Sequence, residues 1–305
     1  MTTLHALVVG EALVDIVQRP DGSSEEIPGG SPANVALTLG RLGRPVELVT
    51  WLGADERGEK VAEHLRDSQV FLGSASCMAP ATSTAVATIG QDGAATYQFN
   101  LDWQVPATEL DPATIVVHSG SIAATVEPGG SQVAELLRRA RTQATITYDP
   151  NARPTIMGDA QVALRRVEEI VAAADVVKVS DEDVEWLTGG ADVDEVALKW
   201  VEGGCPLVVV TCGPRGASAF FPGGRVDVRS PEVDVVDTVG AGDSFMGGLI
   251  DALWAEGLLG ADRRQALSEI SRDQVQRVVD RATAVSAVTV SRAGANPPWS
   301  SELEA

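Results

Sequence analysis

Short apolar runs recur along the chain and alternate with segments of helical periodicity. The valine-rich runs cover residues 6–10, 46–50, 114–120, 144–149, 176–180 and 206–213. Between many of them, apolar residues recur at the spacing of an amphipathic helix, over residues 32–42, 129–141, 160–173 and 193–202. Apolar strands that alternate with helices are typical of a parallel sheet covered by helices. We therefore expect an α/β fold with a doubly wound, mostly parallel sheet.

Two segments break this rhythm and alternate apolar with polar residues instead. Residues 13–19 and 24–27 flank Pro-Asp-Gly-Ser, and residues 83–90 and 94–100 flank Gln-Asp-Gly. An Asp-Gly pair favours a tight turn, so both segments predict hairpins. They either pair into one small sheet over the main domain or form two independent ribbons. On the first interpretation, residues 11–27 and 82–103 form a β-lid, and residues 1–10, 28–81 and 104–305 form the main domain.

Composition narrows the range of partners. The chain has 305 residues, 44% of them hydrophobic, and a formal net charge of −20. Such an acidic protein lacks the basic footprint needed to bind nucleic acid or an anionic membrane surface. The three cysteines, Cys77, Cys205 and Cys212, have no metal-ligand spacing and indicate a reducing compartment. The first residues lack the features of a signal peptide, and no apolar run is long enough to cross a membrane, so we expect a cytoplasmic protein.

The segment most informative about chemistry runs from residue 236 to residue 248. Gly240, Ala241 and Gly242 leave backbone N–H groups uncovered where a helix begins, and such a terminus binds anions. Asp243 follows directly, in the first turn. It is either a helix cap or a base placed beside an anion hole. A base for an alcohol proton and donors for the transferred oxygens are what phosphorylation of a hydroxyl requires.

Other phosphate-binding motifs do not fit the chain. In residues 53–60, Glu59 stands where a Walker loop needs its lysine. In residues 240–247, Phe245 stands where the dinucleotide motif needs its third glycine. An oxidoreductase is therefore disfavoured.

A second informative segment begins at residue 29. Gly29 and Gly30 precede Pro32 and Asn34, a pattern that predicts the start of a helix. By itself this is no more than a tight turn. With Asp15 on the preceding hairpin, it supplies a carboxylate, an amide and bare backbone, which suit a ligand rich in hydroxyl groups.

These two segments resemble the two signatures of the ribokinase, or PfkB, family of carbohydrate kinases. The glycine-rich segment from Gly29 resembles the N-terminal signature, and residues 237–243 resemble the C-terminal one. The resemblance spans essentially the whole chain. It implies a ribokinase-like α/β core with a small β-sheet lid, ATP and Mg²⁺ as cofactors, and a monomer or homodimer.

The resemblance also assigns roles to individual residues. It implies Asp243 as the base, with Gly240, Ala241 and Gly242 as the anion hole. It implies that Asp15, Gly29, Gly30 and Asn34 bind the sugar. The nucleotide phosphates and Mg²⁺ would be served by Ser180 and Asp183, which depart from the family's Asn-x-x-Glu element, and by Thr211, Gly213 and Gly216. A K⁺ ion would be bound through carbonyl groups of Asp237, Val239, Thr289, Arg292 and Gly294.

The sugar itself is harder to predict. Residues 149–153 and 178–183 resemble motifs of bacterial fructokinases and of 2-keto-3-deoxygluconate kinases. Arg153 either meets a phosphate or carboxylate of the substrate or is a surface residue. Asn100, in the second hairpin, either faces the sugar or belongs to the packing of the lid. We expect an ATP-dependent kinase of a small unphosphorylated sugar, fructokinase-like, with ribokinase, ketodeoxygluconate kinase and nucleoside kinase as alternatives. A non-catalytic sensor of sugar or nucleotide is the alternative from another class.

Overall fold

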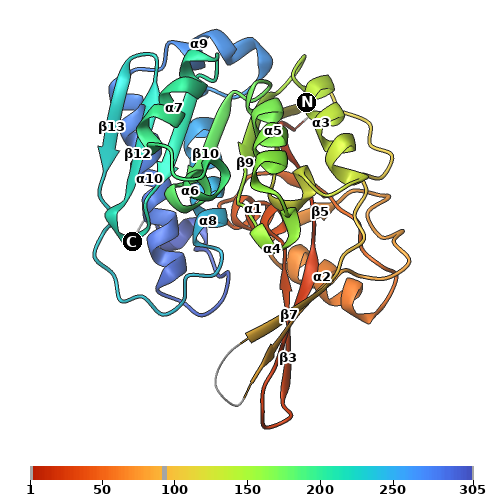
Figure 1. Ribbon diagram of the computed structural model, residues 1–305. Helices are drawn as coiled ribbons and strands as arrows, with labels where there is room; N and C mark the ends of the chain where they lie inside the picture. The colour runs from red at the N-terminus through yellow and green to blue at the C-terminus, as the bar shows by residue number, and fades with distance from the viewer. Residues whose placement is uncertain (1–2, 91–94, 304–305) are drawn as a thin grey trace.

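A nine-stranded sheet forms the centre of the molecule. The computed structural model describes residues 3–90 and 95–303 (Figure 1). The strand order is β13-β12-β11-β10-β9-β8-β1-β4-β5. These strands span His5–Val9 (β1), Val46–Val49 (β4), Val70–Leu72 (β5), Thr114–Gly120 (β8), Thr145–Asp149 (β9), Val176–Ser180 (β10), Leu207–Thr211 (β11), Ala217–Phe221 (β12) and Gly224–Val228 (β13). In this sheet β1, β4, β5, β8, β9, β10 and β11 run parallel and only β12 and β13 are antiparallel, so the expected sheet is confirmed.

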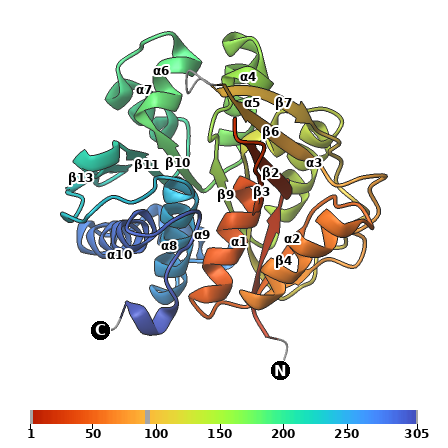
Figure 2. The same ribbon diagram turned by 90° about the horizontal axis from the view of Figure 1, so that it is seen from below.

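Helices cover both faces of this sheet. They span Ser31–Arg41 (α1), Glu56–Asp67 (α2), Gly129–Ala140 (α3), Pro154–Met157 (α4), Ala160–Val171 (α5), Asp181–Thr188 (α6), Val193–Glu202 (α7), Ala241–Ala255 (α8), Arg264–Ser268 (α9) and Arg272–Val290 (α10). Figure 2 shows α1, α8 and α10 on one side of the sheet and α6 and α7 on the other. The four helices predicted from periodicity are α1, α3, α5 and α7. Within the described residues, no helix is both long and apolar enough to span a bilayer.

The central strands are apolar on both faces because each face packs against a helical layer. In β10, Val176 contributes to the core beneath α8 and α10, whereas Val177 and Val179 contribute to the core beneath α5 and α7. All three side chains are fully buried. This two-sided burial explains why the strands appear in the sequence as continuous valine-rich runs without polar alternation.

The two predicted hairpins pair into one small sheet. Its strands are Leu13–Gln18 (β2), Ser24–Gly29 (β3), Thr84–Ile89 (β6) and Ala95–Asn100 (β7), in the order β3-β2-β6-β7. Each hairpin is antiparallel, and β2 joins β6 in parallel. Gly22 has the positive φ of 84° that the first turn was expected to need. The predicted second turn, at residues 91–93, lies outside the described residues. The small sheet projects from the body in Figure 1.

Candidate active site

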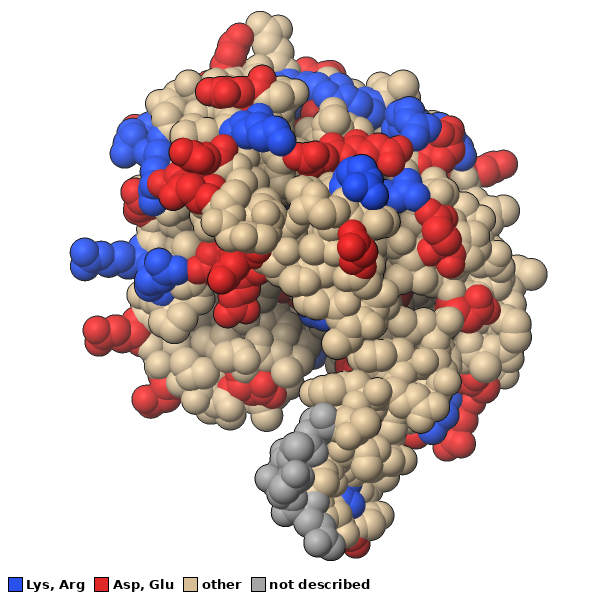
Figure 3. All heavy atoms as spheres, in the orientation of Figure 1, with Lys and Arg blue, Asp and Glu red and all other residues tan. Residues whose placement is uncertain are grey.

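A cavity of about 340 Å³ lies where the small sheet meets the body. The small sheet contributes Asp15, Ala85 and Phe99 to its lining, and the body contributes Asn34 and Asp243. The carboxyl ends of β9 and β10 lie nearby, and ligands of open α/β sheets bind at the carboxyl ends of the strands. On the face shown in Figure 3, acidic and basic side chains are interspersed over the body, and the hollow beside the small sheet is mostly uncharged. The charged side chains of the cavity belong instead to its lining, which contains Glu11, Asp15, Arg153 and Asp243.

The N-terminus of α8 opens into this cavity. Gly240 is its N-cap, and it adopts the left-handed conformation with φ 74° and ψ 2°, which a side chain would disfavour. No side chain caps the helix. In the described part of the chain, the amides of Gly242 and Asp243 have no hydrogen-bond acceptor, whereas the amide of Ala241 donates to Thr238 O at 3.2 Å. Two of the first amides and the helix dipole are thus available to an anion.

Asp243 lies beside these amides and is only 7% exposed. Its Oδ1 accepts a hydrogen bond from Ser31 Oγ at 2.7 Å, and its Oδ2 accepts one from Asn34 Nδ2 at 2.8 Å. Asn151 Nδ2 lies 3.4 Å from Oδ1. Asn34, expected to bind the sugar, thus bonds the candidate base itself. Ser31 and Asn151 were not predicted as site residues, although Ser31 lies in the glycine-rich segment from Gly29 and Asn151 lies in the motif at residues 149–153.

Asp15 faces the cavity from the middle of β2. Burial raises the pKa of this carboxyl above its ordinary value, and the nearby Arg153 guanidinium opposes the rise. A Cβ added to Gly29 would lie 2.2 Å from Asp15 Oδ2, so Gly29 supports Asp15 without being part of the cavity lining itself. Gly30 lines the cavity. The predicted sugar side of the site is therefore assembled from β2 and the start of α1.

Arg153 and Asn100 occupy different positions relative to the cavity. Arg153 lines it, and its Nη1 donates to Asn151 Oδ1 at 2.7 Å and to Ala152 O at 3.0 Å. Asn100 is not among the lining residues and instead donates from Nδ2 to Thr84 Oγ1 at 3.4 Å. Its neighbours Phe99 and Leu101 line the cavity. The second hairpin thus presents apolar rather than amide side chains to this space.

Glu11 is a lining residue that the sequence did not identify. It is 5% exposed, and its Oε2 accepts a hydrogen bond from the amide of Ala123 at 3.1 Å. Burial raises the pKa of this carboxyl to about 7, against hydrogen bonds from Ser121 and Ala123 and the charge of Arg153. Its position between two predicted strands, next to Gly10, was the one available signal.

Ser180 and Asp183 form a capping box at the start of α6. Asp183 Oδ2 accepts from the amide of Ser180 at 3.3 Å, and Oδ1 accepts from the amide of Ala152 at 2.9 Å. The pair therefore fixes the loop after β9 to the start of α6. No group of three or more His, Cys, Asp or Glu side chains in the described residues could hold a metal ion by itself. A divalent ion here would depend on phosphate and water ligands, which suits Mg²⁺.

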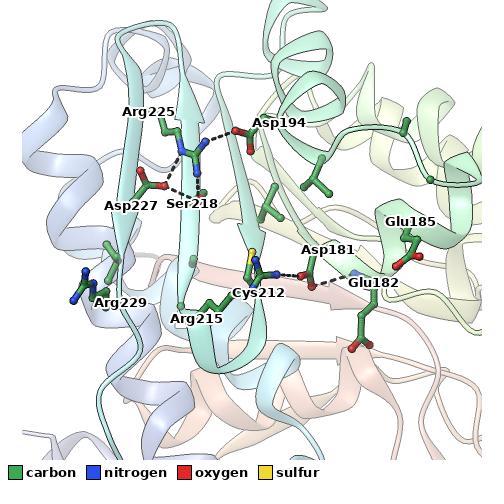
Figure 4. Close-up of a pocket in the computed structure, with 17 residues that line it drawn as sticks. Asp181, Glu182, Glu185, Asp194, Cys212, Arg215, Ser218, Arg225, Asp227 and Arg229 are labelled. Carbon is green, nitrogen blue, oxygen red and sulfur yellow. Dashed lines mark hydrogen bonds and ion pairs between the residues drawn. The ribbon is translucent and has the colours of Figure 1, made fainter.

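The predicted nucleotide turn joins β11 to β12. Thr211 ends β11, and Gly213 and Gly216 both have positive φ, at 54° and 101°. Gly216 borders a second cavity of about 600 Å³, shown in Figure 4. Two of the three arginines that line it are paired, Arg215 with Asp181 and Arg225 with Asp194 and Asp227. The third, Arg229, makes no ion pair within the described residues and is the positive charge left for a phosphate group in this second cavity.

The residues predicted to bind K⁺ come from two segments that the fold joins. Asp237 and Val239 belong to the loop before α8, and Thr289, Arg292 and Gly294 belong to the end of α10 and the turn after it. Asp237 Oδ2 accepts from the amide of Gly294 at 2.8 Å, and the amide of Asp237 donates to Val290 O at 3.2 Å. The two segments are therefore in contact beside the N-terminus of α8.

Comparison with known proteins adds an independent observation. The sequence profile described as "pfkB family carbohydrate kinase" matches residues 3–302. A fructokinase of Rhizobium leguminosarum bv. trifolii is 35% identical over 273 residues, covering 86% of this chain and 83% of the relative. The crystal structure of a Xylella fastidiosa fructokinase with bound ATP superposes with a TM-score of 0.84 at 25% identity, covering 98% and 97%. The crystal structure of a Vibrio cholerae fructokinase in its fructose, ADP and calcium ion bound form superposes with a TM-score of 0.72 at 26% sequence identity. The match covers 95% of this chain and 94% of that one.

Proposed function

The chain belongs to the PfkB family of carbohydrate kinases, and we propose that it transfers the γ-phosphoryl group of ATP to a hydroxyl of fructose or a closely similar unphosphorylated sugar. The observation that carries this proposal is the carboxylate of Asp243 beside the unpaired amides of α8, in a cavity lined for a polyhydroxy ligand. The fructokinases among its relatives and structural neighbours support the choice of sugar.

In the proposed reaction, Asp243 accepts the proton of the sugar hydroxyl as its oxygen attacks the γ-phosphorus. The bond from that phosphorus to the β–γ bridging oxygen breaks, and ADP leaves. The amides of Gly242 and Asp243, with the dipole of α8, stabilise the negative charge on the transferred oxygens. The hydroxyl of Ser31 and the amide groups of Asn34 and Asn151 orient the carboxylate. A substrate hydroxyl would compete with or replace one of these donors on binding.

The lining of the cavity favours a sugar without a phosphate group. Among the described residues, Arg153 is the only Lys or Arg that lines it, and its Nη1 already donates to Asn151 and Ala152. The Asp15 carboxylate can accept hydrogen bonds from sugar hydroxyls but repels a phosphate, and a cavity of about 340 Å³ suits a monosaccharide. We place the acceptor hydroxyl, an exocyclic primary one, against Asp243. The small sheet would act as a lid that excludes water during transfer.

ATP is proposed to lie on the other side of Asp243. Its γ-phosphate would meet the N-terminus of α8, and its other phosphates would extend toward Thr211, Gly213 and Gly216. Val235, Val236 and Val239 on the preceding loop are strongly exposed and offer apolar contact for the base. Mg²⁺ would be bound by phosphate oxygens and water near Ser180 and Asp183, where it neutralises charge on the phosphates. K⁺ would be bound by the carbonyl groups of the joined loops near Asp237.

We place the reaction in the cytoplasm, since the three free thiols of Cys77, Cys205 and Cys212 suit a reducing compartment. A coupled ADP assay with fructose, ribose, 2-keto-3-deoxygluconate and adenosine tests the substrate. Turnover highest with fructose supports the proposal, and preference for another acceptor moves the assignment to the corresponding kinase of the same family. ATP binding without turnover on any of them would favour the sensor alternative.

The role of the base is tested by Asp243→Asn. The asparagine keeps one oxygen for Ser31 but cannot accept the alcohol proton, so we expect kcat to fall about 10²–10⁴-fold while the melting temperature and ATP affinity stay close to wild type. Asp262→Asn is the matched control, because that carboxylate is 80% exposed and remote from the cavity. A purified Asp243→Asn protein with near-normal turnover would contradict the assignment.

A further inference from the structure

Lys178 is a buried cation that the mechanism above does not use. It lies on β10 with its side chain 3% exposed, and its Nζ is 3.0 Å from Oδ2 of Asp149, which is fully buried. The other two lysines of the chain, Lys60 and Lys199, are exposed. Burying an ammonium group costs several kcal/mol unless charges and hydrogen bonds compensate it. A lysine on the surface would avoid this cost, so the buried position of Lys178 indicates a specific role.

The ammonium group packs directly against the anion hole. A Cβ added to Gly242 would lie 2.8 Å from Lys178 Nζ. In the described structure this nitrogen makes one hydrogen bond, to Asp149, although an ammonium has three N–H donors. Gly242 thus lets the charge approach the first turn of α8, where its amide is free for an anion. A side chain at position 242 would displace the ammonium from this position.

Three carboxylates surround this cation. Burial alone would lower the pKa of Lys178, but the charges of Asp149, Asp183 and Asp243 outweigh it, so its pKa is raised and it stays an ammonium. Two further titratable groups nearby stay neutral: burial lowers the pKa of His118 to about 3 and raises the pKa of the Tyr148 hydroxyl. Without Lys178, a phosphate entering the N-terminus of α8 would meet uncompensated negative charge in a low-dielectric surrounding.

Lys178 is also linked to the base through hydrogen bonds. It bonds Asp149 Oδ2, and Asp149 Oδ1 accepts from the amide of Asn151 at 3.2 Å. Asn151 has a positive φ of 37°, a left-handed conformation that asparagine tolerates better than most residues with a side chain. Its Nδ2 reaches Asp243 Oδ1 at 3.4 Å. The chain Lys178–Asp149–Asn151 therefore ends on the carboxylate proposed as the base.

We propose that Lys178 is a positioning residue for phosphoryl transfer: its charge neutralises the carboxylates around the N-terminus of α8 so that the γ-phosphate can enter, and its bond to Asp149 fixes Asn151 against Asp243. This rests on the proposed function. The competing explanation is that Lys178 only balances the buried charge of Asp149 and serves the stability of the fold.

A double variant separates the two explanations. Lys178→Met by itself leaves Asp149 buried and unpaired, which endangers folding. Lys178→Met with Asp149→Asn removes both charges and keeps an oxygen for the amide of Asn151. Lys178→Arg tests whether a cation of another shape retains ATP affinity and kcat. Lys199→Met is the matched control, because that lysine is 70% exposed and pairs with Glu168 on the surface.

Calorimetry with ATP, with ADP, and with ADP plus aluminium fluoride measures the contribution of the γ-position. In the folded double variant, we expect ADP affinity within about threefold of wild type. The affinities for ATP and for the fluoride complex should fall about 10²-fold, the usual cost of removing one group that stabilises the transferred charge. The kcat should fall similarly while KM for the sugar changes little. Partial recovery in Lys178→Arg would support the role of the charge.

A folded double variant with the wild-type ratio of ATP to ADP affinity and wild-type kcat would overturn the proposal, because Lys178 would then be a structural counter-ion only. The proposed function fails by a different result. A wild-type protein that phosphorylates no sugar removes the kinase assignment, and the comparison of ATP with ADP affinity still decides whether Lys178 serves a γ-phosphate.

Discussion

The carboxyl groups around the cavity differ in their hydrogen-bond partners and in their burial. Asp243 has two close hydrogen-bond donors from α1, whereas Glu11 has a backbone amide and a deeply buried position. Burial raises the pKa of Glu11 from 4.5 to about 7. The native state therefore binds the Glu11 proton more tightly than the unfolded state does. Its stabilising contribution is complete below about pH 4.5 and is lost as the pH rises through about 7.

This sign predicts the behaviour of Glu11→Gln. Glutamine keeps an oxygen for the amide of Ala123 and has no proton to lose. Relative to wild type, the free energy of unfolding of the variant should improve by up to about 3 kcal/mol between pH 4.5 and pH 8. Urea denaturation of both proteins at several pH values measures this difference. Parallel stability profiles for the two proteins would show that Glu11 titrates normally.

At the level of secondary-structure elements, the contact between α1 and α8 determines the geometry around the proposed base. Asp243 belongs to α8, while Ser31 and Asn34, which hold it, belong to α1. The helices approach closely at Gly247, where an added Cβ would lie 2.6 Å from Cβ and Cγ2 of Thr38. Thr38 is 1% exposed and has little room to move. The small residue at position 247 is therefore required by the approach of α1 to α8.

We expect Gly247→Ala to lower the free energy of unfolding by about 1–3 kcal/mol, as overpacking usually does. It should lower kcat as well, because separating the helices moves Ser31 and Asn34 away from Asp243. Denaturation and a coupled assay measure both effects. Gly203→Ala, at the exposed end of α7 with φ −70°, is the control. Unchanged kcat in a destabilised Gly247→Ala protein would disconnect helix packing from catalysis.

The whole molecule combines a strongly acidic composition with a site for a polyanion. The net charge of −20 slows the approach of ATP by long-range repulsion. Stable binding must then come from short-range contacts, namely the amides at the start of α8, the buried charge of Lys178 and a metal ion on the phosphates. Salt screens charges over a Debye length of about 10 Å at 0.1 M but hardly affects buried contacts.

Moderate sodium chloride should therefore leave ATP affinity unchanged or slightly higher, as measured by calorimetry. Chelation of divalent ions should abolish transfer. Exchange of sodium for potassium at constant ionic strength should raise activity through the site near Asp237. A steep loss of ATP affinity with salt would instead point to exposed basic side chains as the nucleotide site, against the anion-hole account. Equal rates in the two salts would remove the monovalent-cation proposal alone.

The sequence by itself determined the alternating strands and helices of the body, both hairpins and the segment that carries Asp243. These features depend on periodicities of two and 3.6 residues and on turn and helix-start residues, all of which act over a few positions. The helix that begins after Gly240 was predicted and is α8. The antiparallel pair β12–β13 and the helices α2 and α10 were not predicted as elements. Helix α10 lacks a simple two-sided pattern, because much of its surface is buried.

Only the tertiary structure decided which side chains meet. Ser31 and Asn34 reach Asp243 across 212 and 209 residues of chain, and Lys178 approaches Gly242 from another strand. The same packing directs Asn100 to Thr84 rather than to the cavity, and engages the amide of Ala241 with Thr238. Such contacts depend on the order of strands and the approach of helices. No local pattern encodes them, because they exist only once distant segments are packed together.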